Sequence, residues 1–278
     1  MNEFLIDETT HTMNKYNPSI KNGNTDRLLI SHVFRGNQVD SIASGCFTDV
    51  QVKNLTIGDG IKKLEAGAFE NSRCYDVKLP NGADIDKACF MDSRLHEITL
   101  PNDLCCIKAD TFMRCKSLKK IDGGASVRNI GNRAFAYCKK LTNLQFDNIK
   151  SVGDSSFIGC KGLHTLTLGN EIQRLGKFIF YSCANLKDVT LIGSFNELEF
   201  ETFLGAKGIK RLTLSTSADS LYIPPHCFDE TSLEEITFLG DFEPIVNEKS
   251  CLPKNILVKA ATDSPAMELS HYFPVEAF

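Results

Sequence analysis

The chain contains no tryptophan, and none of its apolar runs is long enough to form a membrane-spanning helix. Such a helix needs about 20 consecutive apolar residues, so we expect no membrane insertion. The first residues, Met1 to Thr10, include acidic side chains and only a brief apolar run at Phe4 to Ile6. They therefore lack the basic region and the long apolar region of a secretory signal.

The chain also lacks an excess of positive charge. It has 31 Lys and Arg residues against 35 Asp and Glu residues, which gives a formal net charge of −4. Nucleic acids and anionic membranes attract proteins through a positive field. On bulk charge alone, we expect neither as a partner.

Catalytic motifs are missing as well. The histidines form no H-E-x-x-H motif, and the chain has no G-x-S-x-G elbow, P-loop or dinucleotide-binding glycine pattern. A nucleophilic cysteine near a histidine stays open as an alternative for Cys105 and Cys106. We predict a protein that is not an enzyme and that uses no cofactor and no metal.

Phenylalanine is abundant, and its spacing reveals an internal repeat. Nine phenylalanines recur every 21 to 25 residues, at Phe47, Phe69, Phe90, Phe112, Phe135, Phe157, Phe180, Phe203 and Phe228. Self-similarity at this period is typical of stacked-repeat proteins. We therefore expect nine coils, in which each Phe packs on its counterparts in the neighbouring coils.

Two further elements accompany each Phe. The first has the pattern L-x-x-I-x-L, for example Leu163, Leu166 and Leu168, and its last three residues alternate as in a half-buried strand. The second is a short extended piece with the pattern I-x-x-I, for example Ile149 and Val152. A single coil cannot enclose an apolar interior, so the coils must stack to form a core.

The run 130–144, I-G-N-R-A-F-A-Y-C-K-K-L-T-N-L, resembles the repeat of the BspA-like leucine-rich-repeat family, whose pattern is approximately I-G-x-x-A-F-x-x-C-x-x-L-x-x-I-x-L-P. The match extends over residues 28 to 240. The resemblance implies a β-rich α/β leucine-rich-repeat solenoid, a right-handed superhelix with a parallel sheet on its concave side. Gly123 replaces the last strand Leu of the fourth coil, so we expect the sheet to be bulged or loosened there.

The resemblance also implies a location and a kind of partner. Proteins of this family are microbial surface or secreted proteins, some of which act in adhesion to host or neighbouring cells. A cytoplasmic location is the alternative if Met1 is the native start. We expect a monomer with a protein partner.

The ends differ from the repeats and predict caps. We divide the chain into an N-terminal segment with a partial capping coil (1–38), a nine-coil solenoid (39–240) and a C-terminal cap (241–278). Residues 7–27 are polar, and we expect a loose hairpin or disorder there. A last strand at 256–258 and a short helix at 264–272 are expected to cover the open end. This closure predicts a complete unit.

Four of the eleven cysteines form a column. Cys115, Cys138, Cys160 and Cys183 each lie three residues after a Phe, and stacking would place them about 5 Å apart. A disulfide or a soft-metal site is an alternative. The odd total and the missing C-x-x-C pairs favour small buried core residues instead. Many free thiols favour a reducing or anaerobic setting.

The strand pattern also identifies an exposed surface, because the residues on either side of the central apolar position face solvent. The predicted protein-binding residues on this face are Asp76, Lys78, Glu97, Thr99, Lys120, Asn143, Gln145, Thr165, Thr167, Asp188, Thr190, Arg211, Thr213 and Glu235. Its threonines could form an ice- or sugar-binding array, but Thr is also simply favoured on exposed strands. We predict a protein-binding or adhesion module. A structural spacer of a larger surface protein and an intracellular partner-recruiting protein are the alternatives.

Overall fold

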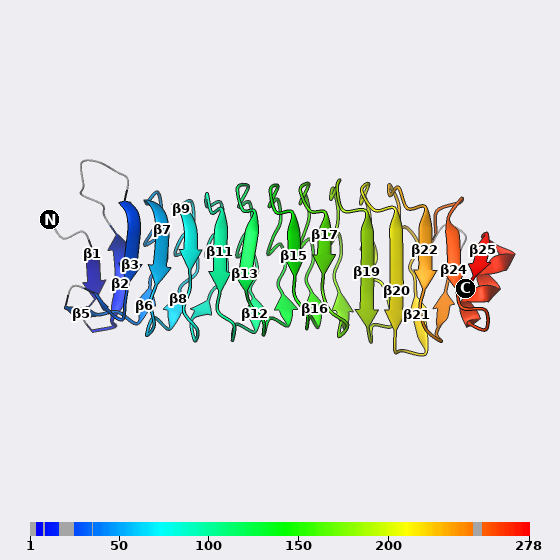
Figure 1. Cartoon of the computed structure of the whole chain (residues 1–278), viewed down its shortest axis with the longest axis horizontal. Coiled ribbons are helices and arrows are strands. Elements are labelled where there is room, and N and C mark those ends of the chain that lie inside the picture. The colour runs from blue at the N-terminus through cyan, green and yellow to red at the C-terminus, as the bar shows by residue number, and fades with distance from the viewer. Residues whose placement is uncertain (1–3, 8, 17–24, 35, 247–251) are drawn as a thin grey trace.

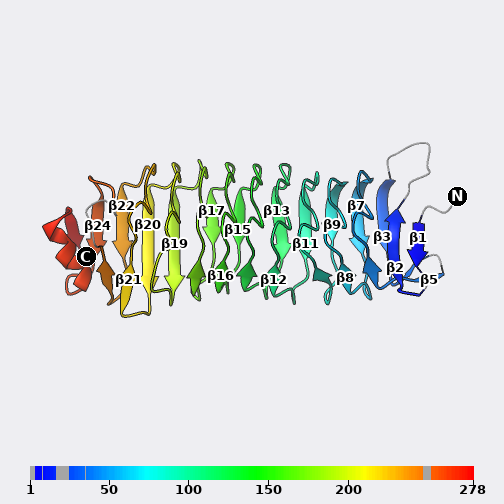
Figure 2. The same ribbon diagram turned by 180° about the vertical axis from the view of Figure 1, so that it is seen from behind.

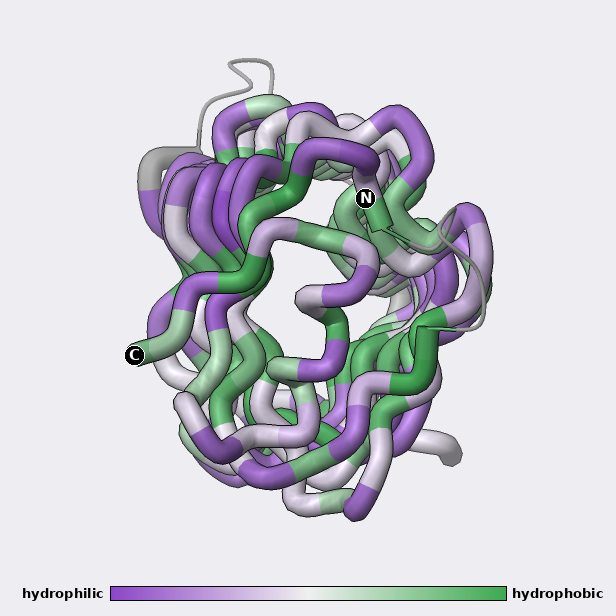
Figure 3. Tube along the Cα trace, turned by 90° about the vertical axis from the view of Figure 1, so that its right-hand side faces the viewer, coloured by the Kyte–Doolittle hydropathy of each residue, from purple (hydrophilic) through white to green (hydrophobic). Residues whose placement is uncertain are grey.

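The computed structural model describes residues 4–7, 9–16, 25–34, 36–246 and 252–278. The chain forms an elongated stack of about ten similar turns with almost no helix. The coils are regularly spaced when seen from either side (Figure 1 and Figure 2). Viewed along the axis, each coil closes into a ring around a common interior (Figure 3). This arrangement confirms the predicted repeat solenoid.

One side of the stack is a ladder of parallel strands, with one strand from each coil. Its members are β3 (Thr25–Ile30), β7 (Gln51–Ile57), β9 (Arg73–Lys78), β11 (Glu97–Leu100), β13 (Lys120–Gly123), β15 (Asn143–Gln145), β17 (Thr165–Thr167), β19 (Asp188–Gly193), β20 (Arg211–Thr216), β22 (Glu235–Phe238), β24 (Leu257–Ala260) and β25 (Val275–Ala277). They are hydrogen-bonded in three groups, β3 to β13, β15 with β17, and β19 to β25.

A second ladder is formed by the I-x-x-I elements. Its strands are β6 (Ser41–Ile42), β8 (Lys63–Leu64), β10 (Asp84–Ile85), β12 (Cys106–Ile107), β14 (Asn129–Ile130), β16 (Ser151–Val152), β18 (Arg174–Leu175), β21 (Ser220–Tyr222) and β23 (Glu243–Ile245). These strands also pair in parallel. The apolar residue of each points inward, which gives the core a second wall.

The phenylalanines form the centre of the core. All nine are buried, and each ring stacks on the next. Ring centroids are 4.6 Å apart for Phe47 and Phe69 and 6.2 Å apart for Phe157 and Phe180. Offset stacking at such distances is favourable beyond the burial of apolar area. The predicted Phe column is confirmed.

The segment around each Phe is a pair of tight turns. In every coil, the residues two before and two after the Phe have positive φ, as for Asp110 (φ 61°) and Arg114 (φ 60°) around Phe112. Only four of these positions hold glycine, at Gly45, Gly67, Gly159 and Gly205. A left-handed residue interrupts a right-handed helix. This is why helix is almost absent, and the α part of the expected α/β solenoid is reduced to one 3₁₀ helix among the described residues.

The sheet is interrupted next to Gly123, where we expected it to be bulged or loosened. Gly123 pairs with Leu100 at the end of β13, and the bonded ladder stops at β13 before it resumes at β15. Gly123 has φ +78°, and a Cβ atom there would lie 2.3 Å from the Leu100 carbonyl oxygen. Glycine is therefore required at this position both by its conformation and by the closeness of the neighbouring coil.

Both ends carry elements that differ from the coils. At the N-terminal end, β1 (Phe4–Asp7) and β2 (Thr12–Tyr16) form an antiparallel hairpin, and β2 pairs with β6. A short antiparallel pair, β4 (Val33–Phe34) with β5 (Asn37–Gln38), follows β3. A hairpin was expected within 7–27, although residues 17–24 lie outside the described residues.

At the C-terminal end, β24 is followed by the 3₁₀ helix η2 (Pro265–His271), which Ser264 caps by accepting a hydrogen bond from the Ala266 amide. Sequence reasoning placed the last strand and this helix, but not β25, which pairs with β24. The division at residues 38 and 240 stays a proposal.

Candidate binding surface on the sheet

The parallel register aligns the exposed residues of the sheet into two columns. The first column runs through Asn54, Asp76, Glu97 and Lys120, then Asn143 and Thr165, then Asp188, Arg211 and Glu235. The second runs through Thr56, Lys78, Thr99 and Asp122, then Gln145 and Thr167, then Thr190, Thr213 and Thr237. All fourteen predicted residues therefore lie on one face of the sheet. Ten are exposed, and Asp76, Thr99, Thr213 and Glu235 are half-buried.

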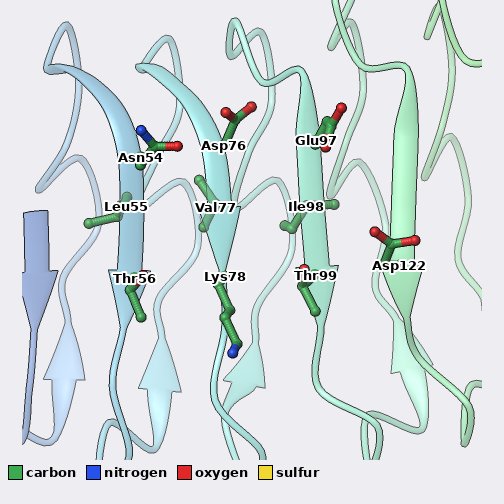
Figure 4. Close-up of a pocket in the computed structure, with 10 residues that line it drawn as sticks. All are labelled: Asn54, Leu55, Thr56, Asp76, Val77, Lys78, Glu97, Ile98, Thr99 and Asp122. Atoms are coloured by element: carbon green, nitrogen blue, oxygen red, sulfur yellow. The ribbon is translucent and has the colours of Figure 1, made fainter. Parts of the chain in front are cut away.

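The N-terminal part of this face carries two carboxylates that lie side by side. Asp76 and Glu97 are register partners on β9 and β11, so their strands are about 4.8 Å apart. Neither carboxylate forms an ion pair with any described residue. They line a shallow hollow on the sheet face. Lys78 also lines this hollow, and its side chain points toward the C-terminal end of β9 (Figure 4). Adjacent like charges destabilise a sheet, and the neighbouring Lys120, on the far side of Glu97, offsets part of this repulsion.

The next charges along the face neutralise each other. Lys120 Nζ lies 2.6 Å from the Asp122 carboxylate, and that hydrogen bond raises the pKa of Lys120. Asp122, the third acidic residue that lines the hollow, is therefore already paired with Lys120 of its own strand, β13.

The middle of the face is polar without charge. It consists of Asn143, Gln145, Thr165 and Thr167. The Thr165 hydroxyl donates to Asn143 Oδ1 at 2.6 Å, and Gln145 Nε2 donates to the Asp147 carboxylate at 3.0 Å. These groups can exchange hydrogen bonds with a partner, but they provide no net field.

The C-terminal part of the face is internally paired. Arg211 Nε lies 2.6 Å from Asp188, and Lys259 lies 3.1 Å from Glu235 and 3.7 Å from Glu276. The hydrogen bond to Glu235 raises the pKa of Lys259. Sequence reasoning missed Lys259 and Glu276 as parts of this face, although the alternation of Val258, Lys259 and Ala260 would have indicated Lys259. Of the predicted acidic residues on this face, Asp76 and Glu97 are the two that form no ion pair with a described residue, although Lys120 is the register neighbour of Glu97 on β13.

The cysteine column lies in the interior of the solenoid. Cys115, Cys138, Cys160 and Cys183 are buried, and each thiol donates to the carbonyl oxygen of the Phe in the preceding coil at 2.9 to 3.1 Å. Burial raises the pKa of Cys115 and of Cys183 to about 12. Each thiol is therefore protonated and held in a hydrogen bond. The described cysteines are all free, which supports the packing interpretation over a disulfide staple.

The alternative of a nucleophilic cysteine finds no support in the geometry. Cys105 is exposed and Cys106 is half-buried. Burial raises the pKa of Cys106, which is the opposite of what an activated thiolate needs. The hollow beside Cys106 is lined by Asn, Ser, Asp and Arg side chains from β14 to β18 and the turns that follow, with no histidine among the described residues that line it.

Within the described part of the chain, no helix has the length and apolar character that a membrane crossing requires. Nor do three or more His, Cys, Asp or Glu side chains of that part converge as metal ligands would.

Comparison with known proteins gives the same repeat architecture. A stretch of 89 residues, 31% of this chain, is 35% identical to the leucine-rich repeat-containing G-protein coupled receptor 5 of Xenopus tropicalis, but it spans only 10% of that protein. A leucine-rich repeat protein of T. pallidum superposes with a TM-score of 0.54 at 21% identity, covering 66% of this chain and 86% of that one. One from Bacteroides ovatus superposes with a TM-score of 0.52 at 19% identity, covering 93% and 84%.

These structural likenesses show the fold. The family is shown by the sequence itself, because the BspA type leucine-rich repeat region matches residues 26–142 and 128–251 in six copies. The protein therefore belongs to the BspA-type leucine-rich repeat family.

Proposed function

We propose that this chain is a non-catalytic, protein-binding repeat module that engages its partner through the sheet face. Families of this type are often surface-associated and protein-binding. The proposal extends this to adhesion, with a host or neighbouring-cell protein as partner and a cell-surface or secreted location.

The observation that carries the proposal is the in-register pair Asp76 and Glu97. On the same face Asp122, Asp188 and Glu235 each form an ion pair with a described residue, whereas Asp76 and Glu97 do not. Glu97 has Lys120 as its register neighbour, but that lysine is hydrogen-bonded to Asp122. Unpaired charges of this kind attract a complementary surface and fix its register. The partner is therefore expected to place Lys or Arg side chains on β9 and β11.

The test has two steps. Cross-linked capture from host-cell and matrix proteins, with this chain as bait, identifies the partner, which is then purified. Its affinity is measured for the wild type, for Glu97→Lys, and for a control in which Asp188→Arg and Arg211→Asp exchange the two charges of an existing pair. We expect Glu97→Lys to weaken binding and the control to preserve it. Equal affinity of all three chains would place the binding site elsewhere.

The two alternatives predict different results. A spacer has no partner for its sheet face, so no captured protein would be sensitive to Glu97→Lys. An intracellular recruiting protein would be found in the cytoplasmic fraction of the producing cells, whereas an adhesion module would be accessible to protease on intact cells or present in the medium.

A further inference from the structure

A second charged surface lies at the edge of the solenoid where the sheet strands begin, the upper edge in Figure 1. Here the chain turns from the Phe segment into the sheet. Eight exposed basic side chains gather along this edge, and we call them the corner ridge. They are Arg73, Arg94, Lys116, Lys119, Lys139, Lys140, Lys161 and Lys187.

The ridge follows the stack because hydrogen bonds join successive coils, either at the corner or in the Phe segment just before it, where the Arg114 amide donates to the Ala136 carbonyl at 2.7 Å. The Lys119 amide donates to the His96 carbonyl at 2.8 Å, and the Arg94 amide donates to the Ser72 carbonyl at 2.8 Å. Further along, the side chain of Asn185 donates to the Lys161 carbonyl at 2.7 Å. Neighbouring coils are thus about 4.8 Å apart, and each of six successive coils contributes one or two of these cations.

None of the eight ridge side chains forms an ion pair with a described residue. Pairing is available to this fold at nearby positions. Arg114 lies 2.5 Å from Asp92, Lys207 lies 3.7 Å from Glu230, and Lys210 pairs with Glu234. The ridge therefore concentrates unneutralised positive charge, although the chain as a whole is negative. Like charges held side by side reduce stability, which indicates a role in binding an anion.

We propose that the corner ridge binds a linear anionic polysaccharide, carrying sulfate or carboxylate groups, laid along the solenoid axis. The spacing of the coils, about 4.8 Å, is close to the length of one pyranose ring in an extended chain. Charges on each or on alternate sugars then meet successive cations without bending of either molecule. Lysines dominate the ridge, and their flexible ammonium groups suit point contacts with groups of variable position.

Other polyanions fit the ridge less well. Each strand of duplex DNA presents a phosphate about every 3.4 Å along the axis, which does not match the coil spacing. Proteins that bind single-stranded nucleic acid interleave cations with aromatic stacking platforms. At this corner Tyr75 stacks on His96 beside Arg73 and Arg94, but the described residues give no second such ring pair beside the lysines from Lys116 to Lys187. An anionic membrane is a plane, and it would leave most of its charge outside a line of side chains this narrow.

The experiment compares two variants with the same loss of charge. The ridge variant carries Lys116→Gln, Lys139→Gln, Lys140→Gln and Lys161→Gln. The control carries Lys62→Gln, Lys63→Gln, Lys87→Gln and Lys177→Gln, which are also exposed and outside the ridge. Binding of a heparin decasaccharide, a short DNA duplex and phosphatidylserine-containing vesicles is measured by titration at several salt concentrations, after circular dichroism has shown that both variants are folded.

We expect the wild type and the control to bind heparin with similar affinity, and the ridge variant to bind at least about tenfold more weakly with a shallower salt dependence. DNA and vesicles should bind more weakly than heparin. Three results would overturn the proposal: no heparin binding by the wild type at low salt, equal loss in both variants, or tighter binding of DNA or vesicles through the ridge. Because the sheet face is unchanged in both variants, these outcomes are independent of the proposed protein partner.

Discussion

The Cys138 thiol donates a hydrogen bond to the carbonyl oxygen of Phe112 in the preceding coil, at 3.1 Å. The same carbonyl also accepts from the Cys115 amide at 3.0 Å. The column cysteine thus links two coils beside the Phe stack, a role that a purely apolar side chain cannot take. Ser93 occupies the same place, three residues after Phe90, and is buried as well.

Replacing Cys138 tests this link. Cys138→Ala removes the donor and leaves a small cavity, so the free energy of unfolding should fall by about 1 to 2 kcal/mol. Cys138→Ser keeps a donor in a position where this fold already accepts serine, and it should lose less than half as much. Urea unfolding measures both. Equal losses in the two variants would show that the hydrogen bond contributes nothing to stability.

The raised pKa values of the column make stability depend on pH. Burial raises the pKa of Cys115 from 9.0 to about 12, so the folded chain keeps a proton that the unfolded chain releases earlier. This contribution is fully present below pH 9 and is lost as the pH rises toward 12. The urea midpoint should therefore fall above pH 9. In a chain with all four column cysteines changed to Ser, the urea midpoint should fall less steeply with pH. A fall identical to that of the wild type would contradict the assignment of this pH dependence to the buried thiols.

A matched pair of glycines separates backbone conformation from crowding. Gly82 has φ +79°, and a Cβ atom added there would have no neighbour within 4 Å, whereas at Gly123, with φ +78°, it would lie 2.3 Å from the Leu100 carbonyl oxygen. Gly82→Ala should cost about 1 kcal/mol for the left-handed conformation alone. Gly123→Ala should cost about 3 kcal/mol, because the neighbouring coil must also move. If urea unfolding gave the same loss for both, the close approach of coils at Gly123 would be wrong.

The turns around the Phe residues predict a stabilising substitution. Ala88 lies two residues before Phe90 with φ 55°, where the two preceding coils have Gly45 and Gly67. Ala88→Gly relieves the left-handed strain and should raise the melting temperature, with a gain of about 0.5 to 1 kcal/mol. As a control, Ala68→Gly changes a buried alanine without positive φ and should destabilise. A loss of stability in both variants would contradict the turn assignment.

Much of the fold could be predicted because the period of the sequence fixes it. The spacing of the phenylalanines gives the coils, and the alternation of apolar and polar residues gives the strands and the outward columns. The turns around Phe112 were not predictable in detail, because Asp110 and Arg114 adopt positive φ through tertiary context rather than through glycine. The strand β25 has only three residues, which is too short for an alternation of apolar and polar residues to predict a strand.

The sequence predicted which residues lie on the sheet face, but not which of their charges are paired. Register places Asp76 beside Glu97, which the aligned repeats already imply. The neutralisation of Glu235 depends on Lys259, which lies beyond the last Phe coil. The corner ridge was hidden because a net charge is a sum over the whole chain, and it does not report where positive charge collects.

The most direct test of the proposed sheet-face site uses a change of charge without a change of shape. The double substitution Asp76→Asn and Glu97→Gln keeps the hollow and removes both carboxylates. The dissociation constant for the purified protein partner should rise by at least about thirtyfold, as expected when a partner's cations lose their counter-charges. A dissociation constant within twofold of the wild-type value would contradict the assignment of this face as the binding site.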